Sequence, residues 1–281
     1  MEKRYIIGID QSTQGTKALL FDGVGHLLRR TDLPHRQIVN EKGWVSHDLN
    51  EIYRNTVQTV KTLVAESGVA PETIAGIGIS NQRETTAIWD KATGEPLEEA
   101  IVWQCGRASG IAQEIAEQGH AEEIREATGL QLSAYFPAAK MAWLLRNGGE
   151  ERQKRAADGK LCLGTIDSWL VYKLTGDHAF KTDFSNASRT QLFNLKTLAW
   201  DEKICEIFGI PACALARVCD SDAVYGTTTM EGLFSEPVPI CGVLGDSHAA
   251  LFGQGCLKPG MIKATYGTGS SLMMNIGDKP I

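Results

Sequence analysis

Residues 5–21 read Tyr5-Ile-Ile-Gly-Ile-Asp10-Gln-Ser-Thr-Gln-Gly15-Thr-Lys-Ala-Leu-Leu-Phe21, two apolar runs on either side of a polar turn. Short apolar runs bounded by turn residues predict β-strands. Asp22-Gly23 marks the next turn, and the segment from Gly25 to Arg30 predicts a third strand. The chain is therefore expected to open with a three-stranded antiparallel meander.

The segment after the meander predicts a helix followed by a buried strand. Asp48, with Glu51 three residues later, is typical of a capping box at a helix start, and Gly68 is typical of a helix end. The run Ile74-Ala-Gly-Ile-Gly-Ile79 is short, continuously apolar and too rich in glycine for a good helix. It predicts a buried strand that delivers Asn81-Gln82-Arg83-Glu84 at its end.

The rest of the chain shows strand, turn and helix signals but no internal repeat and no low-complexity linker. A hairpin turn is expected at 89–96, a strand at 101–103 and another at 238–244. Helices are expected at about 109–118, 138–146, 168–174 and 202–208, and one opens at 246–253. Two strands are expected around a Gly-Thr-Gly turn between residues 263 and 274.

Composition narrows the class of protein. The 281 residues are 43% hydrophobic and 22% charged, which is ordinary for a globular protein, and the apolar runs are too short to span a membrane. The net charge of −6 leaves no basic excess, so neither nucleic acid nor an anionic membrane is an expected partner. The first residues lead directly into a strand instead of a secretory apolar segment, which favours a cytoplasmic protein.

Cysteine and histidine spacing gives no sign of a disulfide framework or a zinc site. The cysteines are odd in number and include no Cys-x-x-Cys pair, so we expect reduced side chains that serve mostly as small core residues. The histidines lack the spacing of zinc ligands. Nucleophile-elbow, Walker-type and dinucleotide-binding glycine motifs are also missing from the sequence.

Two turns could meet phosphate groups. In the first, between Asp10 and Lys17, a carboxylate at a strand end can hold Mg²⁺ through water, while turn amides and hydroxyls face a phosphate. The second turn runs from Thr265 to Ser270 and offers amides and hydroxyls in the same way. An ordinary surface hairpin remains the alternative for both turns.

Two further groups of residues suit a sugar or polyol and its phosphorylation. Arg83 and Glu84 can exchange hydrogen bonds with adjacent hydroxyls, and Trp103 offers an apolar wall for carbon-bound hydrogens. A surface ion pair and a core tryptophan are the alternative. Asp246 lies where a strand passes into a helix, a position that suits either a reactive carboxylate or a helix N-cap.

Taken in this order, the motifs resemble the FGGY family of carbohydrate kinases, with its glycerol kinase branch nearest. The match runs nearly from end to end, which makes the set much more specific than any single motif. Besides the turn at Asp10 to Lys17, it is carried by Ile79 to Thr86, Trp89-Asp90, Ile101 to Gln104, Gly164 to Leu170, Thr182-Asp183, Asn186 to Thr190, Gly245-Asp246 and Tyr266 to Gly269.

The resemblance implies an α/β, actin-like ATPase fold, in which a ribonuclease H-like domain has a mixed sheet flanked by helices. Residues 1–253 would form the N-terminal kinase domain, which is the sugar-binding lobe with the first phosphate turn. Residues 254–281 would be the truncated start of the C-terminal domain. By the same likeness, the cofactors would be ATP and Mg²⁺, and the γ-phosphoryl would move in line to a hydroxyl.

The resemblance also assigns roles to individual residues. Asp246 would be the catalytic base, and Asp10 would organise magnesium. The sugar or polyol would be bound by Gln82, Arg83, Glu84, Trp103, Tyr135, Asp246 and Ser247. The nucleotide would meet Asp10, Ser12, Thr13, Gln14, Lys17, Thr268 and Gly269.

Three departures from the glycerol kinase pattern leave the substrate open. Cys105-Gly106-Arg107 stands where that branch has Asp-Arg-Arg, Ser247 stands where it has Gln, and Gln14-Gly15 where it has hydroxyl residues. The Thr-Gln-Gly-x-Lys run is more similar to xylulokinases, so glycerol, a ketopentose and other polyols all remain candidates. A single-lobe sugar-binding or regulatory protein without catalysis is the alternative function, and a homo-oligomer is one open assembly state.

Overall fold

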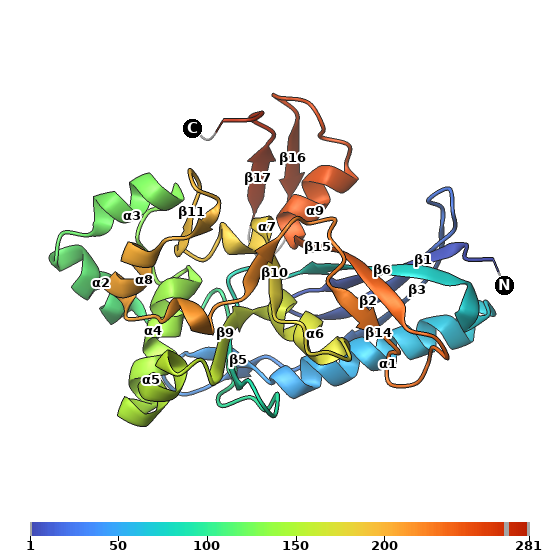
Figure 1. Cartoon of the computed structure of the whole chain (residues 1–281). Helices are drawn as coiled ribbons and strands as arrows, with labels where there is room; N and C mark the ends of the chain where they lie inside the picture. Colours follow the sequence, from blue (N-terminus) through green and yellow to red (C-terminus); the bar gives the residue numbers. More distant parts are fainter. Residues whose placement is uncertain (1, 267–269, 280–281) are drawn as a thin grey trace.

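A six-stranded mixed sheet forms the centre of the protein, in the order β14-β15-β6-β1-β2-β3 (Figure 1). The computed structural model describes residues 2–266 and 270–279. The predicted meander is confirmed as β1 (Tyr5–Gln11), β2 (Gly15–Phe21) and β3 (Leu27–Pro34). On its other side β1 pairs in parallel with β6 (Ile74–Asn81), and β6 pairs in parallel with β15 (Val238–Gly245). The edge strand β14 (Gly226–Thr228) is antiparallel to β15.

The register of the three parallel strands brings their carboxyl ends together. Gln11 of β1 lies opposite Asn81 of β6, and Asn81 lies opposite Gly245 of β15. Because side chains just beyond the carboxyl ends of parallel strands share one edge of a sheet, this edge is a natural place for a ligand. The segments that begin at Ser12, Gln82 and Asp246 therefore leave the sheet side by side.

The predicted helix after the meander is α1 (Leu49–Ser67), which packs against β1, β2 and β3. Asp48 caps it, because its side chain accepts a hydrogen bond from the Asn50 amide at 2.8 Å, and Gly68 ends it with a left-handed φ of 73°. The expected capping box is wrong in its second half. Glu51 instead accepts a hydrogen bond from the Arg36 amide at 3.2 Å, which ties the incoming loop to the helix.

A second sheet lies beside the first, with the order β4-β5-β8-β7-β9. Its strands are β4 (Ile38–Val39), β5 (Val45–His47), β8 (Ala100–Ile101), β7 (Thr86–Asp90) and β9 (Leu161–Thr165). Helix α6 (Ile166–Leu174) continues from β9 and packs against strands of both sheets. In Figure 1, α1 and α6 both lie below the six-stranded sheet, where the Trp169 indole donates to the Leu49 carbonyl at 3.0 Å.

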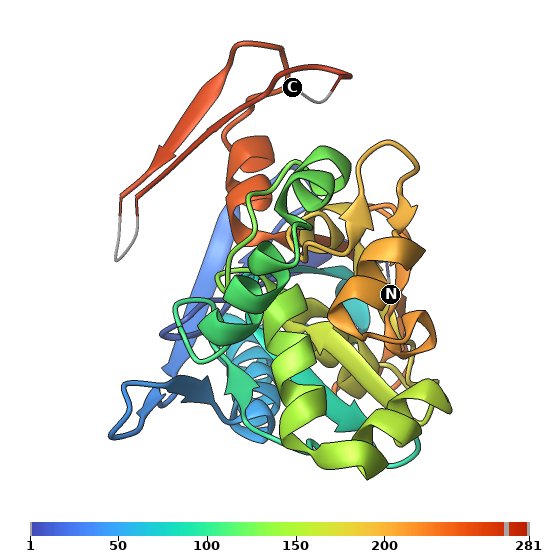
Figure 2. The same cartoon turned by 90° about the vertical axis from the view of Figure 1, so that its left-hand side faces the viewer.

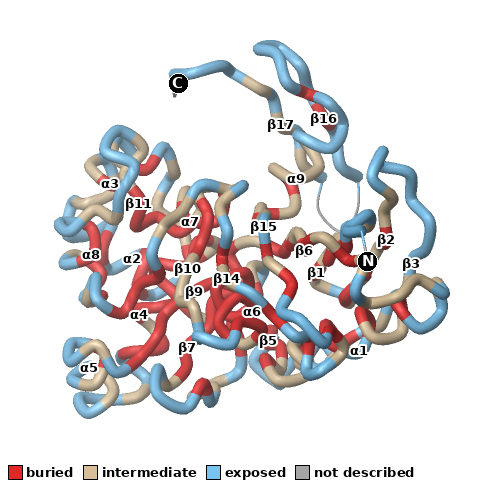
Figure 3. The backbone as a smooth tube through the Cα atoms, turned by 45° about the vertical axis from the view of Figure 1, so that its right-hand side comes forward, coloured by how far each residue is buried: buried red, intermediate tan, exposed pale blue. Residues whose placement is uncertain are grey.

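The remaining helices pack around the second sheet and give the molecule a second apolar core, visible as buried segments in Figure 3. They are α2 (Ser109–Glu117), α3 (Ala121–Thr128), α4 (Pro137–Asn147), α5 (Gly149–Ala157) and α8 (Glu202–Phe208). The short helix α7 (Phe184–Ala187) instead packs against β15 of the first sheet. Two pairs of short strands complete this half: β10 (Lys181–Asp183) with β13 (Arg217–Cys219), and β11 (Phe193–Asn194) with β12 (Ala199–Trp200).

The carboxyl-terminal segment stands apart from both sheets. Helix α9 (Asp246–Gly253) follows β15 and leads to a hairpin of β16 (Ile262–Thr265) and β17 (Ser271–Met274), which confirms the two predicted strands. Figure 2 shows the hairpin projecting away from the body, and Figure 3 shows it as largely exposed. Its contacts with the rest of the described chain run mainly through α9.

The mixed α/β architecture with helices flanking a mixed sheet is the one predicted from sequence. No helix in residues 2–266 or 270–279 has the length and apolar character that crossing a bilayer requires. All seven cysteines are free, and four of them, Cys105, Cys162, Cys205 and Cys256, are buried, which agrees with the prediction that they serve mostly as small core residues. Cys213, in the short 3-10 helix η2 (Ala212–Ala214), and Cys241, in β15, are exposed, and Cys219 is half-buried.

Candidate active site

A cleft of about 490 Å³ lies where the three parallel strands end. It is open to one side, and the hairpin contributes Thr265, Ser270 and Ser271 to its lining. Eleven of the residues predicted from sequence to bind substrate or nucleotide line it: Ser12, Thr13, Gln14, Lys17, Gln82, Arg83, Glu84, Trp103, Tyr135, Asp246 and Ser247. The structure thus brings together residues that are up to 235 positions apart in the sequence (247 − 12). Thr268 and Gly269 fall outside the described residues.

Arg83 and Asp246 form an ion pair in the cleft. Arg83 Nε donates to Asp246 Oδ1 at 2.9 Å, and a terminal nitrogen of the same guanidinium donates to Ser247 Oγ at 2.9 Å. The Arg83 side chain is only 11% exposed, whereas that of Asp246 is 46% exposed. The Ser247 amide also donates to Asp246 Oδ1, at 2.6 Å. Within the described residues, Asp246 Oδ2 has no donor, so this oxygen can accept a hydrogen bond from a ligand.

Asp246 is not the N-cap of α9, which was the alternative reading of its position. Gly245 occupies the cap, and Asp246 is the first helical residue. A glycine is required there for a specific reason. A Cβ on Gly245 would lie 2.5 Å from Arg83 Cδ, so any larger residue would push the arginine away from Asp246.

Glu84 faces the cleft from a strained backbone position. Its φ is 59°, in the left-handed region that non-glycine residues avoid. The side chain is 3% exposed and accepts a hydrogen bond from Arg189 Nε at 2.6 Å. The guanidinium of Arg189 also lies 4.9 Å from the ring centre of Phe136. The Glu84 side chain is therefore oriented by its ion pair with Arg189.

Trp103 and Tyr135 form the aromatic wall of the cleft. Their ring centres are 5.8 Å apart in an edge-to-face arrangement. The Trp103 indole donates a hydrogen bond to Thr13 Oγ1 at 2.9 Å. This bond connects the predicted acceptor wall directly to the predicted phosphate turn.

The turn between β1 and β2 lies at the mouth of the cleft. Lys17 Nζ donates to Asp10 Oδ2 at 2.8 Å, and Ser80 Oγ donates to Asp10 Oδ1 at 3.4 Å. Each side chain of the Lys17–Asp10 pair remains about one-third exposed, at 33% and 34%. Gly15 is required because a Cβ there would lie 2.5 Å from the Leu33 carbonyl oxygen of β3. One carboxylate and one lysine are therefore presented next to the turn.

Gln82 lines the cleft but has its hydrogen-bonding groups engaged inside the protein. Its Nε2 donates to Gln11 Oε1 at 3.1 Å and to the Ser12 carbonyl at 3.3 Å. Its Oε1 accepts from Thr85 Oγ1 at 2.7 Å, and the residue is 1% exposed. These contacts favour a supporting role for Gln82, which joins the end of β6 to the end of β1.

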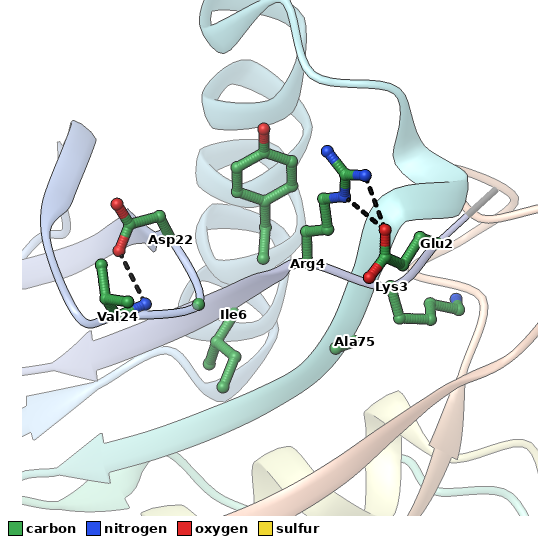
Figure 4. A pocket seen from close by; sticks show the side chains of 9 residues that line it. Glu2, Lys3, Arg4, Ile6, Asp22, Val24 and Ala75 are labelled. Atoms are coloured by element: carbon green, nitrogen blue, oxygen red, sulfur yellow. Dashed lines mark hydrogen bonds and ion pairs between the residues drawn. The ribbon is translucent and has the colours of Figure 1, made fainter.

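A second hollow, of about 560 Å³, lies at the amino ends of β1 and β6, opposite the cleft (Figure 4). Its polar groups bind one another. Arg4 pairs with Glu2 at 2.6 Å, and Asp22 Oδ1 accepts from the Val24 amide at 3.0 Å. None of the residues predicted to bind a ligand lines this hollow. The chemistry expected from the sequence is concentrated in the cleft at the other end of the sheet.

Comparison with known proteins places the chain in a family. Residues 5–253 match the N-terminal domain of the FGGY family of carbohydrate kinases. The chain belongs to this family. Glycerol kinase 1 of Thermotoga maritima is 48% identical over 276 residues, which are 98% of this chain and 56% of that protein. The chain therefore spans about half the length of the curated relatives it matches.

Solved structures of a glycerol kinase and a xylulose kinase share the fold. The structure of Plasmodium falciparum glycerol kinase with ADP has a TM-score of 0.89 at 35% identity, covering 98% of this chain and 55% of that one. Ligand-bound xylulose kinase from Lactobacillus acidophilus has a TM-score of 0.85 at 24% identity, covering 95% of this chain and 53% of that one. The second of these similarities concerns the fold alone.

A buried polar network lies behind the cleft of this FGGY chain. Asn81 and Asn186 exchange two side-chain hydrogen bonds, at 2.9 and 3.0 Å. Asp183 caps α7 and also accepts from Asn186 Nδ2 at 2.8 Å and from Ser221 Oγ at 2.8 Å. Ser185 Oγ in turn accepts from the Gly245 amide at 2.7 Å. The network fixes the ends of β6 and β15 relative to α7, and so fixes the base of the FGGY cleft.

Two cations at the cleft were missed by the sequence reasoning. Arg189 belongs to a segment that carried the family resemblance, but its partner Glu84 is 105 positions away and could not be inferred. Lys140 lies within the predicted helix at 138–146 and is completely buried. A lysine among the apolar residues from Ala138 to Leu145 was the available signal, since lysine rarely occupies the buried face of a helix.

Proposed function

We propose that this chain provides the acceptor-binding half of a kinase that transfers the γ-phosphoryl group of ATP to a hydroxyl of a small polyol or sugar. The observation that carries the proposal is the meeting of Arg83, Asp246 and Ser247 beside the Trp103–Tyr135 wall at the ends of three parallel strands. Residues 1–253 would be the N-terminal domain, and residues 254–281 the start of the C-terminal domain. In the experiments below, 'the complete protein' means this chain joined to a carboxyl-terminal half like that of its longer relatives.

The acceptor is proposed to lie between the aromatic wall and the charged groups. Arg83 and Glu84 supply donors and an acceptor for neighbouring hydroxyls, while Trp103 and Tyr135 contact the carbon-bound hydrogens. Burial raises the pKa of Tyr135, so its hydroxyl stays protonated and can donate to the acceptor. Ser247 lies next to the guanidinium of Arg83 and extends the same polar side.

Asp246 is proposed as the general base. A base must be ionised, held in one orientation and within hydrogen-bonding reach of the proton it accepts. Arg83 and the Ser247 amide both hold Oδ1, which leaves Oδ2 for the acceptor hydroxyl. As the hydroxyl oxygen attacks phosphorus, its proton would pass to Oδ2 of Asp246.

The phosphate groups of ATP are proposed to meet the turn after β1, through Ser12, Thr13, Gln14 and Lys17, and the hairpin turn that includes Thr268 and Gly269. Asp10 is proposed to help hold Mg²⁺, which would neutralise charge on the phosphates. A magnesium ion in a kinase site needs only one or two carboxylates, since water and phosphate oxygens complete its coordination. Asp10 fits this role, because its carboxylate is one-third exposed beside the turn and its neighbour Lys17 can move to a phosphate.

Glycerol is the first acceptor to test, because the relatives described above are named glycerol kinases. Ser247 and the Gln14-Gly15 pair differ from the glycerol kinase pattern, and both lie at the cleft or its mouth. A ketopentose or a longer polyol therefore remains a candidate. The cleft volume of about 490 Å³ is large enough for either class of ligand.

Replacement of Arg83 by alanine tests the proposed acceptor site. In the complete protein, Arg83→Ala should weaken binding of the acceptor roughly tenfold to hundredfold, since hydrogen bonds to a charged group contribute about 1.5–3 kcal/mol. Binding of ADP should stay unchanged. Both dissociation constants can be measured by calorimetry, with Arg125→Ala, which removes an exposed ion pair on α3, as the control. Equal losses for acceptor and ADP would reduce Arg83 to a structural residue.

A further inference from the structure

Lys140 is a fully buried lysine directly behind the cleft. It belongs to α4, and its relative exposure is 0%. Lysine is almost never buried in this way unless an anion pairs with it, because desolvating an ammonium group is costly. In the described part of the chain, no carboxylate oxygen lies within ion-pair distance of Lys140 Nζ. The side chain therefore needs a physical explanation other than a salt bridge.

The contacts of Lys140 are backbone carbonyls of two cleft residues. Its ammonium donates to the Tyr135 carbonyl and lies 3.5 Å from the Glu84 carbonyl. It also lies 5.9 Å from the centre of the Tyr135 ring. Tyr135 precedes α4, whereas Glu84 lies between β6 and β7. One ammonium group thus bridges two chain segments that both line the proposed acceptor site.

The backbone of Glu84 has a conformation that needs contacts such as this one to hold it. Its φ of 59° is unfavourable for a residue with a side chain, so the conformation persists only if its surroundings hold it. The Glu84 carbonyl accepts from Thr86 Oγ1 at 3.1 Å as well as from Lys140. Arg189 holds the side chain but makes no hydrogen bond to this carbonyl in the described part of the chain. Lys140 is the cation that fixes the backbone.

We propose that Lys140 is a positioning residue for the acceptor: its ammonium ties the backbone of Glu84 to that of Tyr135 and so keeps both in the geometry that binds a polyol. The expected effect on polyol binding rests on the proposed function. The contact that Lys140 makes between the two segments does not depend on that function. Lys140 itself lies behind the cleft wall and is not among the residues that line it.

The charge on Lys140 is sensitive to pH near neutrality. Burial lowers its pKa from 10.5 to about 7, while Glu84 and Cys105 raise this pKa and Arg107 lowers it. Between pH 7 and 10.5 the unfolded chain binds more protons at this lysine than the folded chain does. The contribution of Lys140 therefore destabilises the fold most below pH 7, and stability is gained as pH rises through this window.

The first experiment compares the wild-type chain with Lys140→Met and with Lys154→Met, which replaces a lysine that is 75% exposed. Methionine keeps the length and apolar stem of lysine but removes the charge. Because a buried unpaired charge is also removed, we expect the melting temperature of Lys140→Met near pH 7 to match or exceed that of wild type.

Hydrogen exchange in segments 82–86 and 133–137 of Lys140→Met should nevertheless become at least severalfold faster than in wild type. Glycerol affinity, measured by calorimetry, should fall about tenfold or more. Lys154→Met should change none of these quantities.

The outcomes separate a positioning role from a purely structural one. If Lys140→Met loses stability and its exchange rises throughout the chain, Lys140 is only part of the core and the proposal is overturned. Unchanged exchange in the two segments would also overturn it. If wild type binds no glycerol, other polyol or pentulose, the proposed function fails, yet the exchange comparison still decides the role of Lys140.

A second measurement avoids dependence on one variant. In the wild-type chain, glycerol affinity should fall severalfold between about pH 6 and pH 9 as Lys140 loses its proton. Cys105→Ser should show the same fall, although it removes the neighbouring thiol, whose pKa is raised by burial but lowered overall by hydrogen bonds from Arg107 and Val45. An affinity that does not change with pH, or a fall that disappears in Cys105→Ser, would contradict a role for the Lys140 charge.

Discussion

Asp246 shows how much of the proposed chemistry depends on single side chains. Arg83 and the Ser247 amide hold one of its carboxylate oxygens, which sets the direction of the other. The same arginine is almost completely buried and is therefore itself fixed in place. The orientation of the proposed base thus comes from hydrogen bonds with a mostly buried arginine and a backbone amide, and a base held in one orientation transfers protons efficiently.

In the complete protein, Asp246→Asn should lower kcat by about 10²–10⁴-fold, while acceptor affinity stays within a few-fold of wild type. The amide keeps the shape of the side chain but cannot accept the hydroxyl proton. Initial-rate kinetics with saturating ATP, together with calorimetry for the acceptor, would measure both effects. Asp32→Asn, at an exposed position in β3, is the matched control. Turnover that survives Asp246→Asn would exclude this residue as the base.

At this scale the sequence predicted the types of residue better than their contacts. Eleven predicted residues do line one cleft. However, Gln82 is engaged by Gln11 and Thr85, and the tie from Lys140 to Glu84 spans 56 positions. Such pairings depend on how β6 lies beside β1 and how α4 packs against β7, and local periodicity carries no information on that packing. Motifs can identify reactive side chains, but the residues that position them can be identified only from the tertiary structure.

Among the elements, the junction of β15 and α9 has a strict steric requirement. Gly245 allows Arg83 to pass close to the backbone, and its amide donates to Ser185 Oγ at 2.7 Å. The strand can therefore end against α7 while the helix starts beside the guanidinium. This arrangement makes the turn itself, and not only its polar side chains, part of the proposed site.

Gly245→Ala should displace Arg83 and weaken acceptor binding about tenfold, since the new Cβ would lie 2.5 Å from Arg83 Cδ. The control is Gly253→Ala in the same helix α9, where no atom lies within 4 Å of the added Cβ. That change should leave binding intact and stabilise the helix by about 0.5–1 kcal/mol. Calorimetry and thermal unfolding of both variants provide the comparison. Equal acceptor affinity in the two variants would show that Arg83 can adapt and that the close approach has no functional effect.

The elements with strong local signals were predicted well, and those without them were missed. The meander, α1 and β6 combine clear periodicity with turn or cap residues. Helix α5 has a highly polar sequence with one buried residue, Ala156, so no apolar stripe marks it. β9 was missed, because its five residues run directly into α6 without a break, and periodicity alone cannot divide a strand from a helix within such a run. Helix α6 itself was predicted, although it begins at Ile166 and not at Ser168.

For the molecule as a whole, the family resemblance supplied what local patterns could not. Propensity and turn signals predict strands but not that β1, β6 and β15 lie in parallel with matching ends. The match to the FGGY N-terminal domain covers residues 5–253. The assignment of residues 254–281 to a further domain remains a prediction. The projecting hairpin is consistent with that prediction, because its apolar residues Leu272 and Ile262 are 73% and 58% exposed.

The central claim is that this chain binds the acceptor, whereas phosphoryl transfer also needs the carboxyl-terminal half of the complete protein. One paired measurement on the 281-residue chain tests this claim most directly. Glycerol, other polyols and pentuloses are titrated into the chain by calorimetry, and the same sample is assayed for ADP release with ATP, Mg²⁺ and each acceptor. Phosphoryl transfer needs the reacting atoms held about 3–3.5 Å apart. In the proposed mechanism, contacts from both sides of a closed cleft provide this alignment. We therefore predict weak, saturable binding of at least one acceptor with no appreciable turnover. Robust turnover by the chain alone, or the failure of every acceptor to bind, would contradict the account.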